Sequence, residues 1–563
     1  MPITQLPNYP ITNHQSLVMM KRLNNPDSQI RYRVIIALLA LLGVGLYVGL
    51  AAVNGEAGFP LDDGWIHQTY ARNLARTGNW EYVPGEVSAG STAPLWTLLL
   101  AVGYLLRVPY LFWTYFLGWL CLVWLGWAGM DLWRLLWPLG RRQGWLAGAV
   151  LVFTWPLVWA AVSGMETVLF AALGLQMVVL YGRHLSTPAT DVERIGNSFR
   201  DLPNLWWAES NHRGTVLGLG VLAGLLVLTR PDGLGLLLLL AVGLFLAGKS
   251  GQERLQRPAV FILGALLPLV PYFAFNLSSS GTLWPNTFYA KQAEYAFLWE
   301  RPLPLRFVQL LYHSLGGPAE GWRGVSGVHL LLLPGLAAAG WLAVRHDWRH
   351  RRLLYTLPLL WAGGHILLYA WRLPVTYQHG RYLWAAIPVW TLFGLAGWQA
   401  LFVHIQKRLT MLKQFQFVWR TATMLTFALL LVVFLMIGAQ VYTFDVGVIN
   451  GEMVAAARWL EANTPADALI AAHDIGAIGY FAERPLLDLA GLISPEVIDL
   501  LADERLISEY VAESSAEYLV TAPGWPYPTL TNSDLAQLLF ETNYEPTREQ
   551  GFNNMAVYRL NRP

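Results

Sequence analysis

The sequence predicts a mainly α-helical membrane protein with about 11 transmembrane helices, followed by a small soluble α/β domain. Three observations carry this prediction. Of the 563 residues, 55% are hydrophobic and only 13% are charged, whereas about a quarter of a soluble globular chain is charged. Long apolar runs recur along most of the chain. After about residue 443 the composition changes, because this last segment holds 18 of the 36 acidic residues and no lysine.

Eleven apolar runs are long enough, or nearly so, to cross a bilayer. They lie at residues 34–53, 110–133, 144–162, 167–182, 214–229, 233–248, 258–277, 326–344, 353–371, 382–404 and 421–442. A twelfth run, 94–106, is shorter and ends at Arg107-Val108-Pro109. We therefore interpret it as an interfacial helix of the first outer loop.

The distribution of basic residues sets the predicted orientation. With the N-terminus inside, the inner segments hold 22 lysine and arginine residues and the outer loops hold 10, as the positive-inside rule requires. This gives a cytoplasmic tail at 1–33, a membrane domain at 34–442 with a first outer loop at 54–109, and an extracytoplasmic domain at 443–563. We expect a multi-pass protein of the plasma membrane, and we expect the inner loop 183–213 to be irregular.

The sequence pattern after residue 443 predicts alternating helices and strands. Helix-like stretches at 452–463 and 495–513 each precede a strand-like stretch, at 469–472 and 518–520, and a last alternating stretch covers 555–560. Such alternation predicts a small α/β layer domain. A single cysteine, Cys121, excludes an intramolecular disulfide and a thiolate metal cluster.

Two adjacent carboxylates, Asp62 and Asp63, follow the first apolar run and precede a helix-like segment, 64–77. In this segment Ile66, Tyr70 and Leu74 recur every four residues, so we expect it to lie flat at the membrane interface. An aspartate before a helix is also a good N-cap. A cap needs one aspartate rather than two, which favours a functional role for the pair.

The predicted topology gathers further polar motifs on the outer face, where ionisable groups are functional candidates. Each also has a structural interpretation: Glu166 as a cap of the helix that begins at Thr167, Arg230 paired with Asp232 in a tight turn, and Lys291 and Arg381 as interfacial cations. The motifs are Ser163-Gly164-Met165-Glu166, Thr229-Arg230-Pro231-Asp232-Gly233, the stretch from Trp284 to Lys291, and Tyr377-Gln378-His379-Gly380-Arg381-Tyr382.

Carboxylates beside a cationic pocket at a lipid interface suit group transfer from a lipid-linked phosphate. A carboxylate takes the proton of an acceptor hydroxyl, and arginine or lysine stabilises the departing phosphate. Two carboxylates could instead hold Mg²⁺, Mn²⁺ or Ca²⁺ through oxygen ligands. No histidine or cysteine spacing indicates zinc, and there is no glycine-rich loop for a cytosolic nucleotide.

Several motifs together resemble the GT-C superfamily of polytopic glycosyltransferases, and among them the family of the mycobacterial terminal β-(1→2)-arabinofuranosyltransferase. They are Asp62-Asp63, Tyr70-Ala71-Arg72-Asn73-Leu74, Pro84-Gly85-Glu86, Pro94-Leu95-Trp96-Thr97, Ser163-Gly164-Met165-Glu166-Thr167, Thr229-Arg230-Pro231-Asp232-Gly233, the stretch from Pro285 to Lys291, and Asp488-Leu489-Ala490-Gly491-Leu492. The resemblance implies an inverting transfer of a sugar from a polyprenyl-phosphate donor to a glycan or other hydroxyl acceptor outside the cytoplasm.

The resemblance also implies roles for particular residues. Asp62 is the expected base, with Asp63 orienting it, and Asp63 and Glu166 are the candidate ligands of a divalent cation. Glu166 and His67 are candidates for binding the acceptor; His67 departs from the relatives, where this position is usually not ionisable. The candidates for binding the donor phosphate are Lys291, Arg381, His379, Tyr289 and Arg230. Arabinose follows from no residue, and a secondary transporter or a lipid- or glycan-binding protein remains the alternative.

Overall fold

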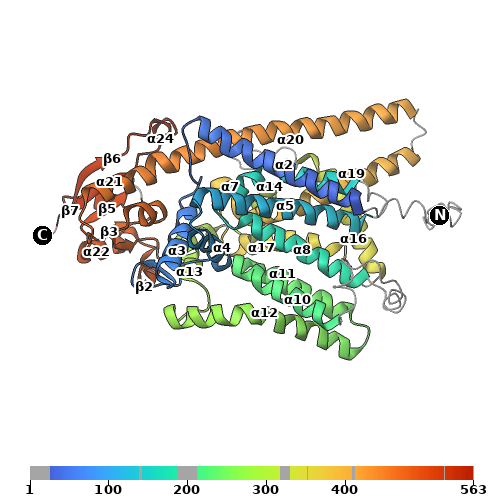
Figure 1. Ribbon diagram of the computed structural model, residues 1–563, viewed down its shortest axis with the longest axis horizontal. Helices are drawn as coiled ribbons and strands as arrows, with labels where there is room; N and C mark the ends of the chain where they lie inside the picture. The colour runs from blue at the N-terminus through green and yellow to red at the C-terminus, as the bar shows by residue number, and fades with distance from the viewer. Residues whose placement is uncertain are drawn as a thin grey trace.

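The computed structural model describes residues 26–137, 143–186, 212–316, 330–350, 353–408, 413–524 and 526–561. A helical bundle forms most of this part of the chain, and the C-terminal domain lies at one end of it, beside α3 (Asp63–Thr77) and α13 (Asn286–Glu294) (Figure 1). Residues 1–25 of the predicted cytoplasmic tail and most of the loop 183–213 lie outside the described residues.

Within the described residues, each of the 11 predicted apolar runs overlaps a helix of the bundle or a pair of helices; the first four residues of the run 326–344 are not described. The bundle helices are α2 (Pro26–Val53), α5 (Tyr110–Leu136), α6 (Gly144–Phe153), α7 (Trp155–Val162), α8 (Thr167–Ser186), α10 (His212–Thr229), α11 (Leu234–Ala247), α12 (Gly251–Ser280), α14 (Leu303–Gly316), α16 (Leu333–His350), α17 (Thr356–Arg372), α19 (Ile387–Arg408) and α20 (Lys413–Ile449). The sequence does not predict α14, which leaves Leu305, Val308 and Tyr312 exposed.

Six helices of the described residues are long and apolar enough to cross a membrane, and the bent pair α6 and α7 would make a seventh span. The bend is 59°. It falls at Thr154, which is extended, and Pro156 follows at the second position of α7, where its missing N–H costs nothing. The chain is thus a multi-pass membrane protein, and the count of 11 spans stays a prediction.

The first outer loop folds over the end of the bundle. It contains α3, the short antiparallel pair β1 (Glu81–Val83) and β2 (Glu86–Val87), and α4 (Pro94–Leu105), which is a helix as the run 94–106 predicts; its interfacial position stays a prediction. The helix α3 forms where it is expected, but its apolar face does not meet lipid. Ile66 and Tyr70 pack in one cluster with Ala456, Ile475 and other buried residues of the C-terminal domain. The expectation of a helix flat on the membrane is therefore wrong.

The C-terminal domain is the small α/β layer that its sequence predicts. Its sheet has the strand order β4-β3-β5-β7-β6, with β3 parallel to both β4 and β5 and the remaining pairs antiparallel. The strands are β3 (Ile470–Ala472), β4 (Leu486–Asp488), β5 (Tyr518–Thr521), β6 (Ala536–Glu541) and β7 (Ala556–Leu560), and the helices include α21 (Ala455–Asn463) and α22 (Glu504–Glu513). The sequence does not predict the short β4 or β6. Helix α20 runs past the expected boundary at residue 443 without a break.

Candidate functional site

A cavity of about 760 Å³ lies where the first outer loop, α11, α13 and α17 meet. Its lining is polar at one end and apolar at the other. The polar part includes Asp63, His67, Glu166, Arg230, Asp232, Lys291, His365, Arg381 and Tyr382. The apolar part comes from α11 and α17 and includes Leu234, Leu238, Val242, Leu360, Leu368 and Trp371. Several of these apolar side chains, among them Leu238, Val242 and Leu360, are exposed.

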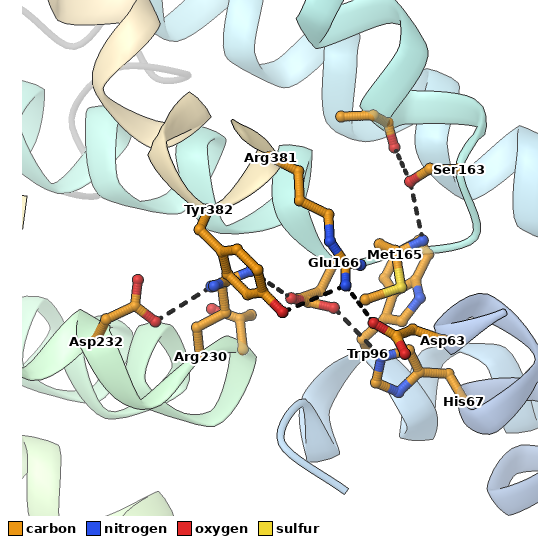
Figure 2. Close-up of polar contacts among 12 residues, drawn as sticks. Asp63, His67, Trp96, Ser163, Met165, Glu166, Arg230, Asp232, Arg381 and Tyr382 are labelled. Atoms are coloured by element: carbon orange, nitrogen blue, oxygen red, sulfur yellow. Dashed lines mark hydrogen bonds and ion pairs between the residues drawn. The ribbon is translucent and has the colours of Figure 1, made fainter. Parts of the chain in front are cut away.

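Asp63 and Arg381 meet at the polar end of this cavity. The Arg381 guanidinium donates a hydrogen bond to the Asp63 carboxylate and another, of 3.3 Å, to the Tyr382 hydroxyl (Figure 2). Gly380 precedes Arg381 with a φ of +68°, which glycine adopts without strain, and this turn aims the arginine inwards. Burial alone would raise the pKa of Asp63, but Arg381 and Lys291 lower it to about 2.

A second network of charged side chains lies at the polar end of the cavity. Glu166 accepts a hydrogen bond of 3.0 Å from Nη1 of Arg230, and Nε of Arg230 donates one of 3.1 Å to Asp232. Nε2 of His67 lies 3.4 Å from the other Glu166 oxygen. The expected pairing of Arg230 with Asp232 is therefore present, but Arg230 also binds Glu166. Burial opposes ionisation of Glu166, yet His67 and Arg230 lower its pKa to about 2.

The loop from Ser163 to Glu166 owes its shape to a close packing contact. Gly164 has a φ of +80°, and a Cβ at this position would lie 2.9 Å from the Phe59 ring. The Trp96 indole donates a hydrogen bond of 2.8 Å to the Gly164 carbonyl. These contacts turn Glu166 into the cavity, where its carboxylate contacts Arg230 and His67.

Lys291 reaches the cavity from α13. This helix is tied to the first outer loop because the Asn286 amide donates to the Ala89 carbonyl at 2.9 Å and the Thr287 hydroxyl donates to the Gly90 carbonyl at 2.5 Å. The Lys291 ammonium lies 3.2 Å from Glu294. Burial disfavours its charge, but Glu294 and Asp63 raise the pKa of Lys291 above its usual value. Lys291 therefore lines the cavity with a charged ammonium group, rather than extending to the membrane interface.

Asp62 does not line the cavity with these residues, contrary to the expectation. It stands at the N-cap position of α3 but makes no side-chain capping bond there. Its two carboxylate oxygens instead accept hydrogen bonds from the backbone amides of Gly476 and Ala477, at 2.6 and 2.8 Å. Burial and the nearby Asp474 carboxylate raise the pKa of Asp62 to about 7.

Two further predicted phosphate ligands also lie away from the cavity lining. Nε2 of His379 is 2.8 Å from Asp445, and its imidazole ring packs edge-on against Trp155 and Trp159. The Tyr289 ring packs against Phe288. We therefore do not include His379 or Tyr289 among the residues of the candidate site, because neither side chain lines the cavity.

The structure adds two residues that the sequence does not single out, Tyr369 and His365, and brings in Tyr382 from the motif that begins at Tyr377. The Tyr369 hydroxyl accepts a hydrogen bond of 2.6 Å from Arg230, and Nδ1 of His365 lies 3.4 Å from Asp232. Tyr382 lies under both arginines, with its ring centroid 5.3 Å from the Arg230 guanidinium carbon and 4.9 Å from that of Arg381. A signal for His365 is present in the sequence, since it is an ionisable residue within an apolar run.

The possible metal ligands, Asp63 and Glu166, do not form a metal site here. Each carboxylate is already bound to an arginine. Within the described part of the chain, no group of three or more histidine, cysteine, aspartate or glutamate side chains is arranged to hold a metal ion. The donor set does not fit a divalent cation, and we derive no step through one.

Comparison with solved structures identifies the architecture. The structure of ArnT from Cupriavidus metallidurans bound to undecaprenyl phosphate superimposes with a TM-score of 0.54 at 14% identity, over 93% of this chain and 97% of that one. The chain has the GT-C fold. The archaeal oligosaccharyltransferase AglB from Archaeoglobus fulgidus, in complex with an inhibitory peptide and a dolichol-phosphate, superimposes on this chain with a TM-score of 0.54 at 13% identity, over 88% of this chain and 70% of that one.

Three other comparisons are less informative about this chain. A family described as "Domain of unknown function (DUF8728)" matches residues 438–558, which cover the end of α20 and the C-terminal domain. No curated protein sequence matches the chain. A mycobacterial arabinofuranosyltransferase, AftD, aligns over 94% of this chain and 42% of that one, at 14% identity and a TM-score of 0.43. That similarity is too low to support any particular sugar.

Proposed function

We propose that this protein is a membrane glycosyltransferase that moves a sugar, with inversion, from a polyprenyl-phosphate donor to a hydroxyl acceptor on the extracytoplasmic face of the plasma membrane. One observation carries the proposal: a single cavity joins a polar end that holds Arg230, Lys291 and Arg381 to an apolar end that is lined by α11 and α17. A polyprenyl-phosphate sugar has the same division between an anionic head and a long apolar tail. The GT-C fold supports the proposal, because the ArnT structure is described as bound to undecaprenyl phosphate.

In this proposal the donor phosphate lies against Arg381 and Lys291. Arginine presents a planar set of donors that match phosphate oxygens, and lysine adds a point charge. Both groups stabilise the negative charge that the phosphate acquires as the sugar departs. The sugar then lies beside the cavity face of α3, which carries Asp63 and His67. Asp63 replaces Asp62 as the aspartate of the first outer loop that faces the substrate.

The apolar end of the cavity holds the first isoprene units of the donor. Leu238, Val242, Leu360 and Leu368 line this part of the cavity from two facing helices. Burial of an isoprene unit there would contribute favourable free energy in proportion to the apolar area removed from water. A secondary transporter would not need an apolar groove next to the charged groups, and this favours the transferase over that alternative. A lipid-binding membrane protein would need the same groove, and turnover of the donor is what distinguishes the transferase from it.

The test is transfer by the purified protein from a panel of decaprenyl-phosphate sugars carrying arabinofuranose, mannose, galactose or an aminosugar. We expect one donor to be converted to free decaprenyl phosphate and a glycosylated acceptor, both detected by mass spectrometry. Arg381→Gln should lower kcat/KM by at least 100-fold, since it removes a charge at the departing phosphate. Arg76→Gln is the matched control, because Arg76 is an exposed arginine of α3 that pairs with Glu483 outside the cavity. No turnover of any donor by the wild-type protein would contradict the proposal.

A further inference from the structure

The three residues that precede Arg381 have an unusual backbone. Gln378, His379 and Gly380 have φ values of +51°, +61° and +68°, so together they form a left-handed turn. Residues other than glycine visit this conformation rarely, and they do so singly rather than in succession. The sequence accounts for Gly380 but not for the two residues before it. Contacts elsewhere in the fold must therefore hold the turn, since a strained backbone persists only where its surroundings determine it.

The side chain of His379 supplies one such contact. Its Nε2 atom makes a hydrogen bond of 2.8 Å with the Asp445 carboxylate, near the C-terminal end of α20. The Trp159 indole of α7 donates a hydrogen bond of 2.9 Å to the same carboxylate oxygen. The imidazole ring also packs edge-on against Trp155 and Trp159. Asp445 is thus held by two partners, and the histidine is fixed between α7 and α20.

The backbone of the turn is held as well. The Trp384 indole of η5 (Arg381–Ala386) donates a hydrogen bond of 3.1 Å to the His379 carbonyl. On the other side, a Cβ at Gly380 would lie 2.5 Å from the His313 ring of α14. Trp384 and His313 are both buried. The turn is therefore enclosed by neighbouring helices, and its left-handed form is a product of the tertiary structure.

The turn decides the direction in which the Arg381 side chain leaves the backbone. The guanidinium bonds to Asp63 and to the Tyr382 hydroxyl fix the far end of this side chain (Figure 2). These bonds form only if the backbone directs the side chain into the cavity. Each residue contributes two rotatable backbone angles, so a turn of the opposite hand would send the chain, and Arg381 with it, in a different direction.

We propose that His379 is a positioning residue for Arg381. Its bond to Asp445 holds the left-handed turn, and the turn places the guanidinium where the donor phosphate binds. The inference rests on the proposed glycosyl transfer for the role of Arg381. It gives His379 a task different from the phosphate binding that the sequence predicts, because the imidazole does not line the cavity and acts only through Arg381.

Two amide variants separate the side-chain bond of His379 from its backbone conformation. His379→Gln keeps an N–H donor at about the reach of Nε2, whereas the side chain of His379→Asn is too short to reach Asp445. Asparagine tolerates a left-handed backbone better than glutamine does, so a purely local role would favour the asparagine variant. We expect the opposite result, because only glutamine restores the bond to Asp445.

The expected values concern kcat/KM for the donor that the wild-type protein turns over. His379→Asn should lower it at least tenfold, since a displacement of about 1 Å at a reacting site can cost about 100-fold. His379→Gln should stay within about threefold of the wild type, because the misplacement behind that loss is largely avoided. A loss in His379→Gln as large as that in His379→Asn would overturn the inference.

The same variants in an Arg381→Gln background test whether the effect passes through Arg381. Residues that act together give losses that do not add, so His379→Asn should lower kcat/KM by less than about twofold further in this background. His346→Asn is the matched control, since His346 also lies beside an aspartate, 3.3 Å from Asp347, and does not line the cavity; its kcat/KM should be unchanged. An equal loss with and without Arg381 would overturn the inference, because a general structural defect acts in both backgrounds.

A second measurement does not depend on turnover. Electron cryomicroscopy of the wild type and of His379→Gln should show the Arg381 guanidinium beside Asp63, and the same group should be displaced in His379→Asn. An unchanged turn and an unchanged Arg381 in His379→Asn would overturn the inference, whatever the activity. If Arg381 moves as expected but the wild-type protein converts no donor, the result counts against the glycosyl transfer and not against the positioning of Arg381.

Discussion

Asp62 and Gly476 lie 414 residues apart in the chain, and Oδ2 of the Asp62 carboxylate accepts a hydrogen bond of 2.6 Å from the Gly476 backbone amide. The neighbouring Ala477 amide donates to the other oxygen. These are the first amides of a helical segment that continues as η7 (Ile478–Ala482). The first N–H groups of a helix lack partners within it. Asp62 therefore caps a helix of the C-terminal domain from the first outer loop.

Replacing Asp62 should weaken the attachment of the C-terminal domain. We expect Asp62→Ala to lower the free energy of unfolding by about 0.5–2 kcal/mol, the usual range for the loss of a helix cap. The measurement is thermal unfolding of the purified protein together with the rate of proteolysis between the bundle and the domain. Asp503→Ala is the matched control, because Asp503 caps α22 within the domain. This variant should lower the free energy of unfolding by a similar amount, but it should not speed proteolysis between the bundle and the domain. Equal cleavage in both variants would argue against this role.

Stability should also depend on pH through Asp62. Burial and Asp474 raise its folded-state pKa to about 7, while an aspartate in an unfolded chain has a pKa of about 3.9. The folded state then binds more protons than the unfolded state between these values, so stability falls as pH rises from about 4 to about 7. The raised pKa values of Asp474 and His473 act in the same direction. We expect the Tm of the wild type to fall from pH 5 to pH 8, and a shallower slope for Asp62→Asn. An identical slope would exclude Asp62 as a contributor.

Filling the apolar end of the cavity should affect long donors selectively. Gly364 lines the cavity, and a Cβ at this position would meet no atom within 4 Å. Gly364→Phe should raise KM for a decaprenyl-phosphate donor by about tenfold, since roughly two buried methylene groups supply that much free energy. A donor with only two isoprene units should be less affected. Gly363→Phe is the control, because this neighbour also has open space around it and does not line the cavity. The same loss for both variants would point to a general effect on α17.

The orientation of the chain can be tested with introduced cysteines. Cys121 is the single cysteine and is buried, so a new exposed thiol should be the main reactive one. A membrane-impermeant maleimide added to intact cells should label Ala512→Cys, on the exposed side of α22, and should label Lys249→Cys, in the predicted inner loop between α11 and α12, only after lysis. The reverse labelling pattern would invert the proposed topology.

Much of the architecture could be predicted from patterns that depend on local composition. The apolar runs lie on helices because an isolated segment in lipid must satisfy its own backbone hydrogen bonds. The acidic, lysine-free segment after residue 443 forms the expected α/β layer. The cavity residues Arg230, Glu166, Lys291 and Arg381 also come from motifs that stand out as ionisable groups near apolar runs.

The sequence by itself therefore determined the membrane bundle, the α/β domain and most of the residues that meet in the cavity. Only the tertiary structure decided which of the two adjacent aspartates faces the cavity. Neighbouring residues at a helix start point in directions about 100° apart, and nothing local says which direction is inward. The backbone amides of Gly476 and Ala477, more than 400 residues further along the chain, bind the Asp62 carboxylate. Asp63 is therefore the aspartate that lies in the cavity beside Arg381.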